Sequence, residues 1–168
     1  MTSLITDDLI ALAAQVGEKL QNQRHSIACA ESCTGGLVAA AFTSVAGSST
    51  WFDRGYVTYS NQAKQELLGV RDDTLARFGA VSEETAMEMA SGVLLSGTSA
   101  SIALSTTGIA GPGGATPGKP VGMVCFGLAQ RTADGVNVSA LTQVFQGNRA
   151  QVREQSVRFA LAQVLELG

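Results

Sequence analysis

The chain has 168 residues, of which 45% are hydrophobic and 15% charged, and its net charge is −3. This balance predicts one domain over residues 1–168 with a sizeable core, and the negative charge disfavours a nucleic-acid partner. A single histidine and three cysteines exclude a multi-histidine metal site within one chain and disfavour a disulfide framework or a structural zinc site. The sequence shows no signal-peptide pattern and no apolar run of about 18 residues, so we expect a cytoplasmic protein without membrane contact.

The first half of the chain alternates predicted helices and strands. Apolar positions at helical spacing predict a helix over residues 6–23, with Thr6 as its N-cap. A short apolar run predicts a buried strand over 26–30. There follow a predicted helix over 34–46, a strand over 51–59, short helices over 61–68 and 73–78, and a helix from the N-cap Ser82 to Leu95.

The second half contains more strands. Strands are predicted over 101–106, 121–130 and 136–145, the last two joined by the hairpin signal Asp134-Gly135, and a helix over 148–167 ends the chain. A glycine-rich loop over 108–118 follows the first of these strands. Because helices alternate with strands early and a hairpin comes late, we predict an α/β fold, a three-layer α/β/α sandwich with a mixed, mainly parallel sheet.

The segment Ala30–Gly36 lies where the first predicted strand meets a predicted helix. N–H groups at such a junction favour negative charge, which suits an anionic ligand or an oxyanion formed during acyl transfer. A serine there exposes its Oγ, so Ser32 is a candidate nucleophile, while capping of the helix by Ser32 or Thr34 is the alternative. Cys33 competes with Ser32 because a thiolate at a helix start has a lowered pKa.

A serine nucleophile needs a base, and the chain offers few. His25 precedes the first predicted strand whereas Ser32 follows it. A strand rises about 3.3 Å per residue, so the two side chains are well over 10 Å apart and His25 is a poor base for Ser32. Lys19 falls on the polar face of the first predicted helix, where we expect it to be solvated. Lys64 follows the second predicted strand, at the edge where open α/β sheets place their sites. A lysine desolvated there can act as a base, although an exposed helix position is the alternative.

Two further features are candidate ligand contacts. Thr107 and Gly108 begin the glycine-rich loop, which matches neither a P-loop nor a dinucleotide fingerprint and is either a ligand contact or a mobile surface loop. Arg149 and Arg153 lie one turn apart in the last predicted helix and could grip a phosphate, although arginines on a helix surface are common.

Four motifs occur in order over roughly residues 8–165: Ala30-Glu31-Ser32-Cys33-Thr34-Gly35-Gly36, Gly55-Tyr56-Val57-Thr58-Tyr59-Ser60-Asn61, Gly79-Ala80-Val81-Ser82 and Gly108-Ile109-Ala110-Gly111-Pro112. In this order and spacing they resemble the C-terminal domain of the competence/damage-inducible protein CinA, whose standalone versions are nicotinamide-nucleotide amidohydrolases. The loop after Pro112 varies within that family, so its role in holding substrate is not carried over.

The resemblance implies hydrolysis of nicotinamide mononucleotide to nicotinate mononucleotide and ammonia, in pyridine-nucleotide salvage. It implies Ser32 as the nucleophile with Tyr59 and Lys64 beside it, a nucleotide substrate, no metal or other cofactor, and a homo-oligomer. We assign the remaining contacts as follows: Cys33, Thr34, Gly35 and Gly36 around an oxyanion, Thr107 and Gly108 on the nucleotide, and Arg149 or Arg153 near the phosphate. The alternative is a nucleotide- or phosphate-binding module without catalysis.

Overall fold

Five strands form one sheet in the order β2-β1-β3-β4-β5 in the computed structural model, which describes residues 3–168. The strands are β1 (Ile27–Glu31), β2 (Phe52–Val57), β3 (Ile102–Gly108), β4 (Met123–Thr132) and β5 (Gly135–Val144). β1 pairs in parallel with β2 and with β3, while β4 pairs antiparallel with β3 and with β5. Within this described sheet β4 therefore runs against the other four strands, and the predicted mixed, mainly parallel sheet is confirmed.

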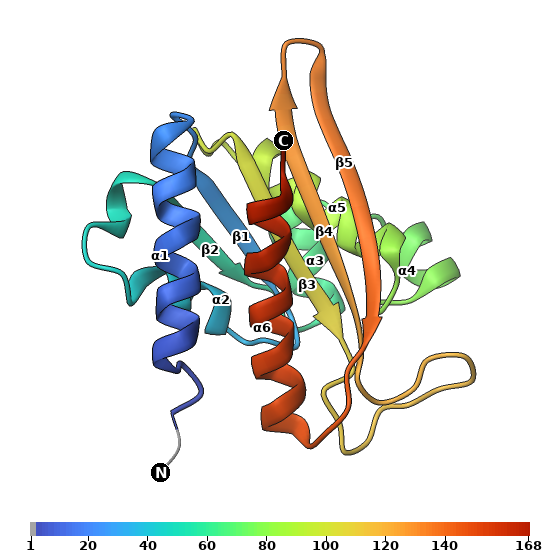
Figure 1. Ribbon diagram of the computed structural model, residues 1–168. Helices are drawn as coiled ribbons and strands as arrows, with labels where there is room; N and C mark the ends of the chain where they lie inside the picture. Colours follow the sequence, from blue (N-terminus) through green and yellow to red (C-terminus); the bar gives the residue numbers. More distant parts are fainter. Residues whose placement is uncertain (1–2) are drawn as a thin grey trace.

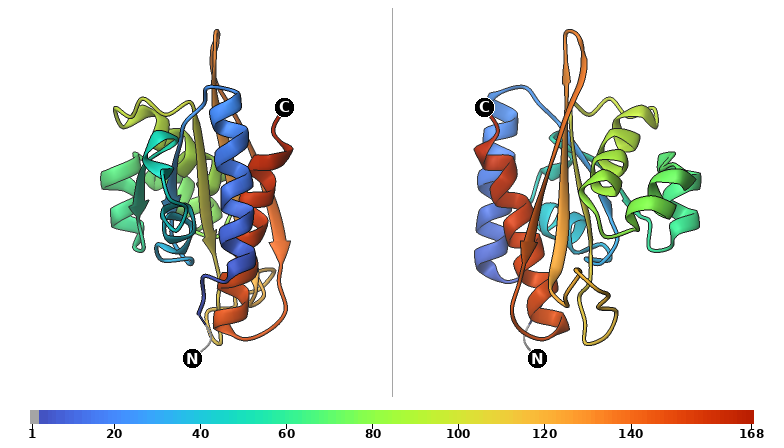
Figure 2. Two further views of the ribbon diagram at one scale, coloured as in Figure 1. Left: turned by 60° about the vertical axis from the view of Figure 1, so that its left-hand side comes forward. Right: turned by 90° about the vertical axis from the view of Figure 1, so that its right-hand side faces the viewer.

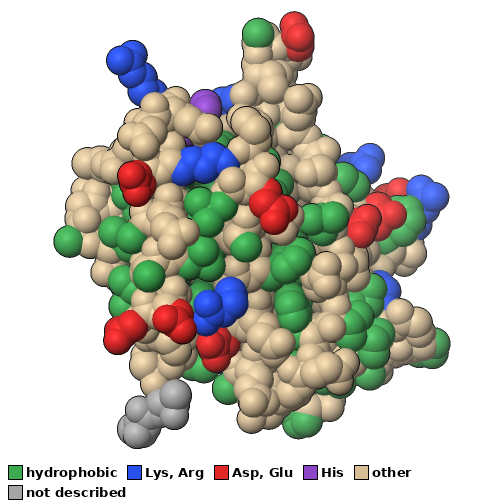
Figure 3. All heavy atoms as spheres, viewed as in Figure 1, with side chains coloured by type: hydrophobic (Ala, Val, Ile, Leu, Met, Phe, Trp, Pro, Cys, Tyr) green, Lys and Arg blue, Asp and Glu red, His purple; other side chains and the backbone are tan. Residues whose placement is uncertain are grey.

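Helices cover both faces of the sheet, as the two views of Figure 2 show. One face carries α1 (Asp7–Asn22), α2 (Leu37–Thr43) and α6 (Arg149–Glu166), and the other carries α3 (Asn61–Leu68), α4 (Asp72–Phe78) and α5 (Glu83–Leu95). A short 3₁₀ helix, η1 (Ser48–Thr50), leads into β2. The predicted three-layer sandwich is thus confirmed (Figure 1). Figure 3 shows acidic and basic side chains scattered among hydrophobic ones over the face that carries α1 and α6.

The central strand β1 is buried along its whole length, because an apolar core lies on each of its faces. Ile27 and Cys29 belong to the core beneath α1, α2 and α6, whereas Ala28 and Ala30 belong to the core beneath α5. This alternation is the two-residue period of a strand. It places the next residue, Glu31, on the α2 side, and it makes a rigid support for the turn that follows.

Side-chain caps set several helix boundaries where the sequence predicted them. Thr6, Ser60, Ser82 and Asn148 each accept a backbone N–H at the start of α1, α3, α5 and α6. These contacts confirm the predicted starts of the helices, because a cap depends on residues within one turn.

Several predicted boundaries differ from the structure, and two of the corrections affect the site. The helix predicted over 34–46 begins at Leu37, since Gly35 (φ +58°) and Gly36 (φ +99°) take left-handed backbone that turns the chain first. The strand predicted over 51–59 ends at Val57, so Thr58 and Tyr59 lie in the connection to α3. Both segments leave the sheet at its carboxyl edge.

Candidate active site

The carboxyl ends of the parallel strands β1, β2 and β3 meet at one edge of the sheet, as expected for a ligand site in an α/β fold. A pocket of about 240 Å³ opens there. It is lined by Ser32, Cys33, Tyr59, Asn61, Lys64, Ala80, Val81, Thr107, Gly108, Ala110 and Arg149. The structure therefore brings together the three predicted catalytic residues and four of the predicted substrate contacts.

Lys64 is the buried cation of this pocket, with 1% of its surface exposed. Its ammonium group donates to Ser32 Oγ at 3.0 Å and to the Thr58 carbonyl at 2.8 Å. Among residues 3–168 no carboxylate lies within ion-pair distance of it. Burial lowers the pKa of Lys64 to about 8, because the charged form is desolvated. The side chain can thus be neutral near physiological pH and accept a proton from Ser32.

Ser32 occupies the turn directly after β1 and is 8% exposed. Its backbone N–H donates to the Thr106 carbonyl of β3 at 2.9 Å, which ties the turn to the neighbouring strand. The side chains of Ser32 and Thr34, which were alternative helix caps, make no cap to α2. Ser32 instead presents its hydroxyl to Lys64, the arrangement of a nucleophile with its base.

Cys33 lines the same pocket but is a weak rival as nucleophile. Burial raises the pKa of its thiol to about 12, so it carries almost no thiolate near neutral pH. Its main-chain N–H, like that of Thr34, has no backbone carbonyl as acceptor among the described residues. These two N–H groups directly follow Ser32 and are candidate donors to an oxyanion.

Tyr59 and Arg149 form the rim of the pocket. Tyr59 is 60% exposed, and its phenol oxygen accepts from Arg149 Nη2 at 2.9 Å. Arg149 Nη1 donates to the Gly111 carbonyl at 2.8 Å, so the guanidinium joins the connection after β2 to the loop after β3. The rim of the pocket therefore carries the positive charge of Arg149.

Four predicted contacts do not line the pocket: Thr34, Gly35, Gly36 and Arg153. Thr34 is fully buried, and its hydroxyl donates to Glu31 Oε1 at 2.6 Å. Arg153 donates to the carbonyls of Cys33 (3.2 Å) and Thr34 (3.1 Å). These residues lie behind the turn that carries Ser32.

The two candidates on β3 line the pocket and also have packing roles. Thr107 Oγ1 donates to the Ala80 carbonyl at 2.7 Å, which holds the connection before α5 against the strand. At Gly108 a Cβ would lie 2.6 Å from Val124 Cγ2 and 2.7 Å from the Met123 carbonyl oxygen. Close packing of β3 on β4 therefore requires a glycine at position 108.

Residues 9–167 match the family model described as the CinA C-terminal domain. The chain belongs to the CinA C-terminal domain family. A protein of Enterobacter agglomerans named nicotinamide-nucleotide amidohydrolase PncC is 51% identical over 92% of this chain and 92% of its own length. The protein of the same name from Escherichia coli K12 is 47% identical over 92% of this chain and 91% of its own length.

Longer proteins also contain this domain. The "CinA-like protein" of Chloroherpeton thalassium is 53% identical over 93% of this CinA C-terminal domain, which spans 37% of that protein's length. The crystal structure of the competence/damage inducible protein CihA from Agrobacterium tumefaciens superposes with a TM-score of 0.89 at 42% identity, covering 98% of both chains. The fold of the CinA C-terminal domain is thus shared with solved structures.

Some features of this CinA C-terminal domain were not predicted from the sequence, or were predicted wrongly. Asn61 lines the pocket, and its place just after the Ser60 cap was the available signal. Lys19 was expected to be solvated, but its ammonium donates to the Val164, Leu165 and Leu167 carbonyls at the end of α6. The predicted separation of His25 from Ser32 is confirmed, in contrast, because His25 precedes β1 and contacts Ser101 just before β3.

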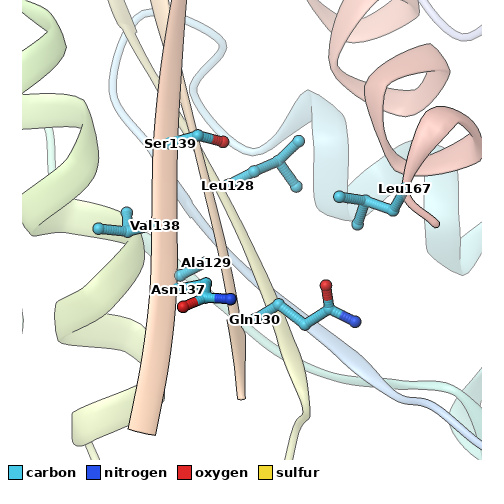
Figure 4. Close-up of a pocket in the computed structure, with 7 residues that line it drawn as sticks. All are labelled: Leu128, Ala129, Gln130, Asn137, Val138, Ser139 and Leu167. Carbon is cyan, nitrogen blue, oxygen red and sulfur yellow. The ribbon is translucent and has the colours of Figure 1, made fainter. Parts of the chain in front are cut away.

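A second hollow lies between the β4–β5 hairpin and the end of the chain (Figure 4). It is lined by Leu128, Ala129, Gln130, Asn137, Val138, Ser139 and Leu167. None of these seven side chains is acidic or basic, so this hollow offers no acid–base pair, and the pocket at Ser32 is the candidate active site of the CinA C-terminal domain.

Metal-binding clusters and membrane-spanning helices are both absent from the described part of the chain. Residues 3–168 hold no cluster of three or more His, Cys, Asp or Glu side chains placed to bind a metal ion. No helix in this range is both long and apolar enough to cross a membrane.

Proposed function

We propose that the protein hydrolyses the carboxamide of nicotinamide mononucleotide to give nicotinate mononucleotide and ammonia, a step of pyridine-nucleotide salvage. The observation that carries this proposal is the 3.0 Å contact between Ser32 Oγ and the buried Lys64 Nζ. Relatives of the same length carry the name nicotinamide-nucleotide amidohydrolase, which indicates the class of substrate. We also retain as predictions a cytoplasmic location and a homo-oligomer.

The first step is attack by Ser32. Neutral Lys64 accepts the hydroxyl proton while Ser32 Oγ forms a bond to the carboxamide carbon, and the carbonyl electron pair moves to oxygen. Direct transfer is favoured over a route through Tyr59, because Lys64 Nζ lies 3.0 Å from Ser32 Oγ whereas the Tyr59 phenol oxygen contacts Arg149 at the rim. The N–H groups of Cys33 and Thr34 stabilise the oxyanion, and losing one such donor costs about 3–4 kcal/mol in comparable sites.

The intermediate then collapses. The Lys64 ammonium returns its proton to the carboxamide nitrogen, the C–N bond breaks, and ammonia leaves an ester on Ser32. Water next attacks this ester and gives a proton to Lys64, which passes it to Ser32 Oγ as the carboxylic acid product departs and then ionises in solvent. The net reaction adds one water to the amide and regenerates both side chains.

Arg149 is the residue we assign to the substrate phosphate. Its guanidinium lies on the pocket rim, where its contacts to Tyr59 and to the Gly111 carbonyl leave further N–H donors available. A charge-assisted bond of this kind contributes about 1.5–3 kcal/mol. Thr107 and Gly108 form the pocket wall in this arrangement.

The test is ammonia release from nicotinamide mononucleotide by the wild type and by Ser32→Ala. We expect Ser32→Ala to lose at least about 10³-fold in kcat. The matched control is Ser156→Ala, because Ser156 is buried in α6 and donates to the Val152 carbonyl away from the pocket. Undiminished turnover by Ser32→Ala refutes the nucleophile assignment. Tight calorimetric binding of the nucleotide by a wild type without turnover supports the binding-module alternative.

A further inference from the structure

Glu31, the residue before Ser32, carries a buried carboxylate, with 1% of its surface exposed. It accepts three hydrogen bonds from O–H and N–H groups, those of Thr34 Oγ1 (2.6 Å), Val38 N (2.8 Å) and Ala39 N (3.1 Å), and a longer contact from Cys29 Sγ (4.0 Å). Within residues 3–168 no lysine, arginine or histidine lies within ion-pair distance of it. Burial of a carboxylate is costly unless hydrogen bonds compensate it, so these three donors hold the group in place.

The carboxylate of Glu31 caps the N-terminus of α2. The N-cap position of α2 is Gly36, which has no side chain, and Glu31 supplies the acceptor for the N–H groups of Val38 and Ala39. The hydrogen bonds join the end of β1 to the first turn of α2. They therefore fix both ends of the chain segment that contains Ser32.

Arg153 holds the same turn from α6. Its Nε and Nη2 donate to the carbonyls of Cys33 and Thr34. Because a trans peptide is planar, fixing the Cys33 carbonyl also fixes the opposite direction of the Thr34 N–H. At Gly35 a Cβ would lie 3.2 Å from Arg153 Nη2, so glycine leaves room for this approach.

A hydroxyl pair ties this arrangement to the sheet. Thr34 Oγ1 lies 2.7 Å from Thr106 Oγ1, and the Thr106 carbonyl accepts from the Ser32 N–H. The turn over residues 32–36, called here the Ser32 turn, is therefore connected to β3, to α2 through Glu31, and to α6 through Arg153. Neither charged side chain lines the pocket.

We propose that Glu31 and Arg153 are positioning residues that hold the Ser32 turn in its reactive shape. Glu31 accepts from Thr34 in the turn and from the first N–H groups of α2, and Arg153 donates to the two turn carbonyls described above. This inference rests on the proposed function, since it concerns the same nucleophile. It differs from a phosphate contact by Arg153, because a positioning residue acts on the chemical step whereas a phosphate contact acts on substrate binding.

The experiment compares Glu31→Gln and Arg153→Met with the wild type. Glutamine keeps the size of Glu31 but turns one acceptor oxygen into a donor that faces an N–H or a hydroxyl. Methionine keeps most of the Arg153 stem and removes its donors. We expect kcat to fall about 10- to 100-fold in each variant, with KM within threefold, because small displacements of reacting groups have effects of this size.

Two matched controls have the same chemistry far from the pocket. Glu88 accepts from Arg71 N (2.8 Å) and Thr74 Oγ1 (2.6 Å), so Glu88→Gln disturbs a similar carboxylate cap, which in this case also pairs with the Arg71 guanidinium. Arg131 donates to the Ala100 carbonyl (2.9 Å) before β3, so Arg131→Met removes a similar contact to the main chain. We expect both controls to keep kcat within twofold while the thermal unfolding temperature falls.

Labelling of Ser32 by phenylmethanesulfonyl fluoride, followed by intact mass, separates failure of this inference from failure of the proposed function. In that reaction the Oγ–S bond forms, fluoride leaves and Lys64 takes the proton. A wild type that is labelled but releases no ammonia refutes the proposed substrate, and slower labelling of the two variants still supports positioning. A wild type that is neither labelled nor active overturns both.

Three results overturn the positioning roles. Labelling and kcat at wild-type values in folded Glu31→Gln refute the role of Glu31. A raised KM with unchanged kcat in Arg153→Met makes Arg153 a substrate contact. If circular dichroism shows that Glu31→Gln is unfolded, Thr34→Val replaces it. That change removes one hydroxyl from the same hydrogen-bond network and keeps the side-chain shape. Wild-type kcat in Thr34→Val then refutes the role of Glu31.

Discussion

The pH dependence of ammonia release follows from the burial of Lys64. Its pKa of about 8 lies well below the ordinary 10.5, and the neutral form is the base. About one molecule in ten carries that form at pH 7 and about nine in ten at pH 9. We therefore expect kcat/KM to rise about tenfold per pH unit below pH 8 and to level off above it.

The same shift predicts how stability depends on pH. Between about pH 8 and 10.5 the unfolded chain binds a proton on Lys64 that the folded protein does not, so the free energy of unfolding rises with pH through this window. A shift of about 2.5 pKa units corresponds to about 3 kcal/mol. Below pH 8 the full cost of the buried ammonium group remains. Urea unfolding at pH 7.5 and pH 10 measures most of this difference, because the titration of Lys64 extends slightly beyond both pH values.

Lys64→Met is the variant that tests both statements. It removes the titrating amine and with it most of the activity. The rise of kcat/KM toward pH 8 and the part of the stability increase that is due to Lys64 therefore disappear. Lys19→Met is the control, because Lys19 binds carbonyls at the end of α6 and not the pocket. A wild-type profile that stays flat between pH 6 and pH 9, or a limb near pH 8 that persists in Lys64→Met, contradicts the assignment of Lys64 as the base.

Three further predictions concern other parts of the site. Iodoacetamide at pH 8 leaves Cys33 unmodified in the native protein, because burial raises the pKa of this thiol to about 12; modification seen by intact mass refutes this. Gly108→Ala lowers the free energy of unfolding by about 1–3 kcal/mol, because its Cβ would collide with Val124. Gly113→Ala is the control, with nothing within 4 Å of its added Cβ, and equal urea midpoints for the two variants argue against the collision. Arg149→Met raises KM for nicotinamide mononucleotide about 10- to 100-fold but leaves KM for the dephosphorylated riboside near its wild-type value, and equal effects on both substrates exclude a phosphate contact.

Much of the fold could be predicted because its signals are local. The starts of α1, α3, α5 and α6 depend on side-chain caps, each of which accepts from the N–H three residues ahead: Thr6, Ser60, Ser82 and Asn148. Buried strands show as apolar runs, and the order of strands and helices limits the layers to a few arrangements. The start of α2 was missed because the left-handed backbone at Gly35 and Gly36 extends the turn before the helix begins.

The sequence by itself determined the layers of the fold, most helix boundaries and the motif that contains Ser32, because hydrogen-bonding periods and caps act within a few residues. Only the tertiary structure decided which side chains meet in the site. Lys64 meets Ser32 across 32 residues because α3 begins at the same edge of the sheet where β1 ends. Of two arginines one helical turn apart, Arg149 faces the pocket whereas Arg153 binds the back of the turn, since successive turns of α6 pass different neighbours.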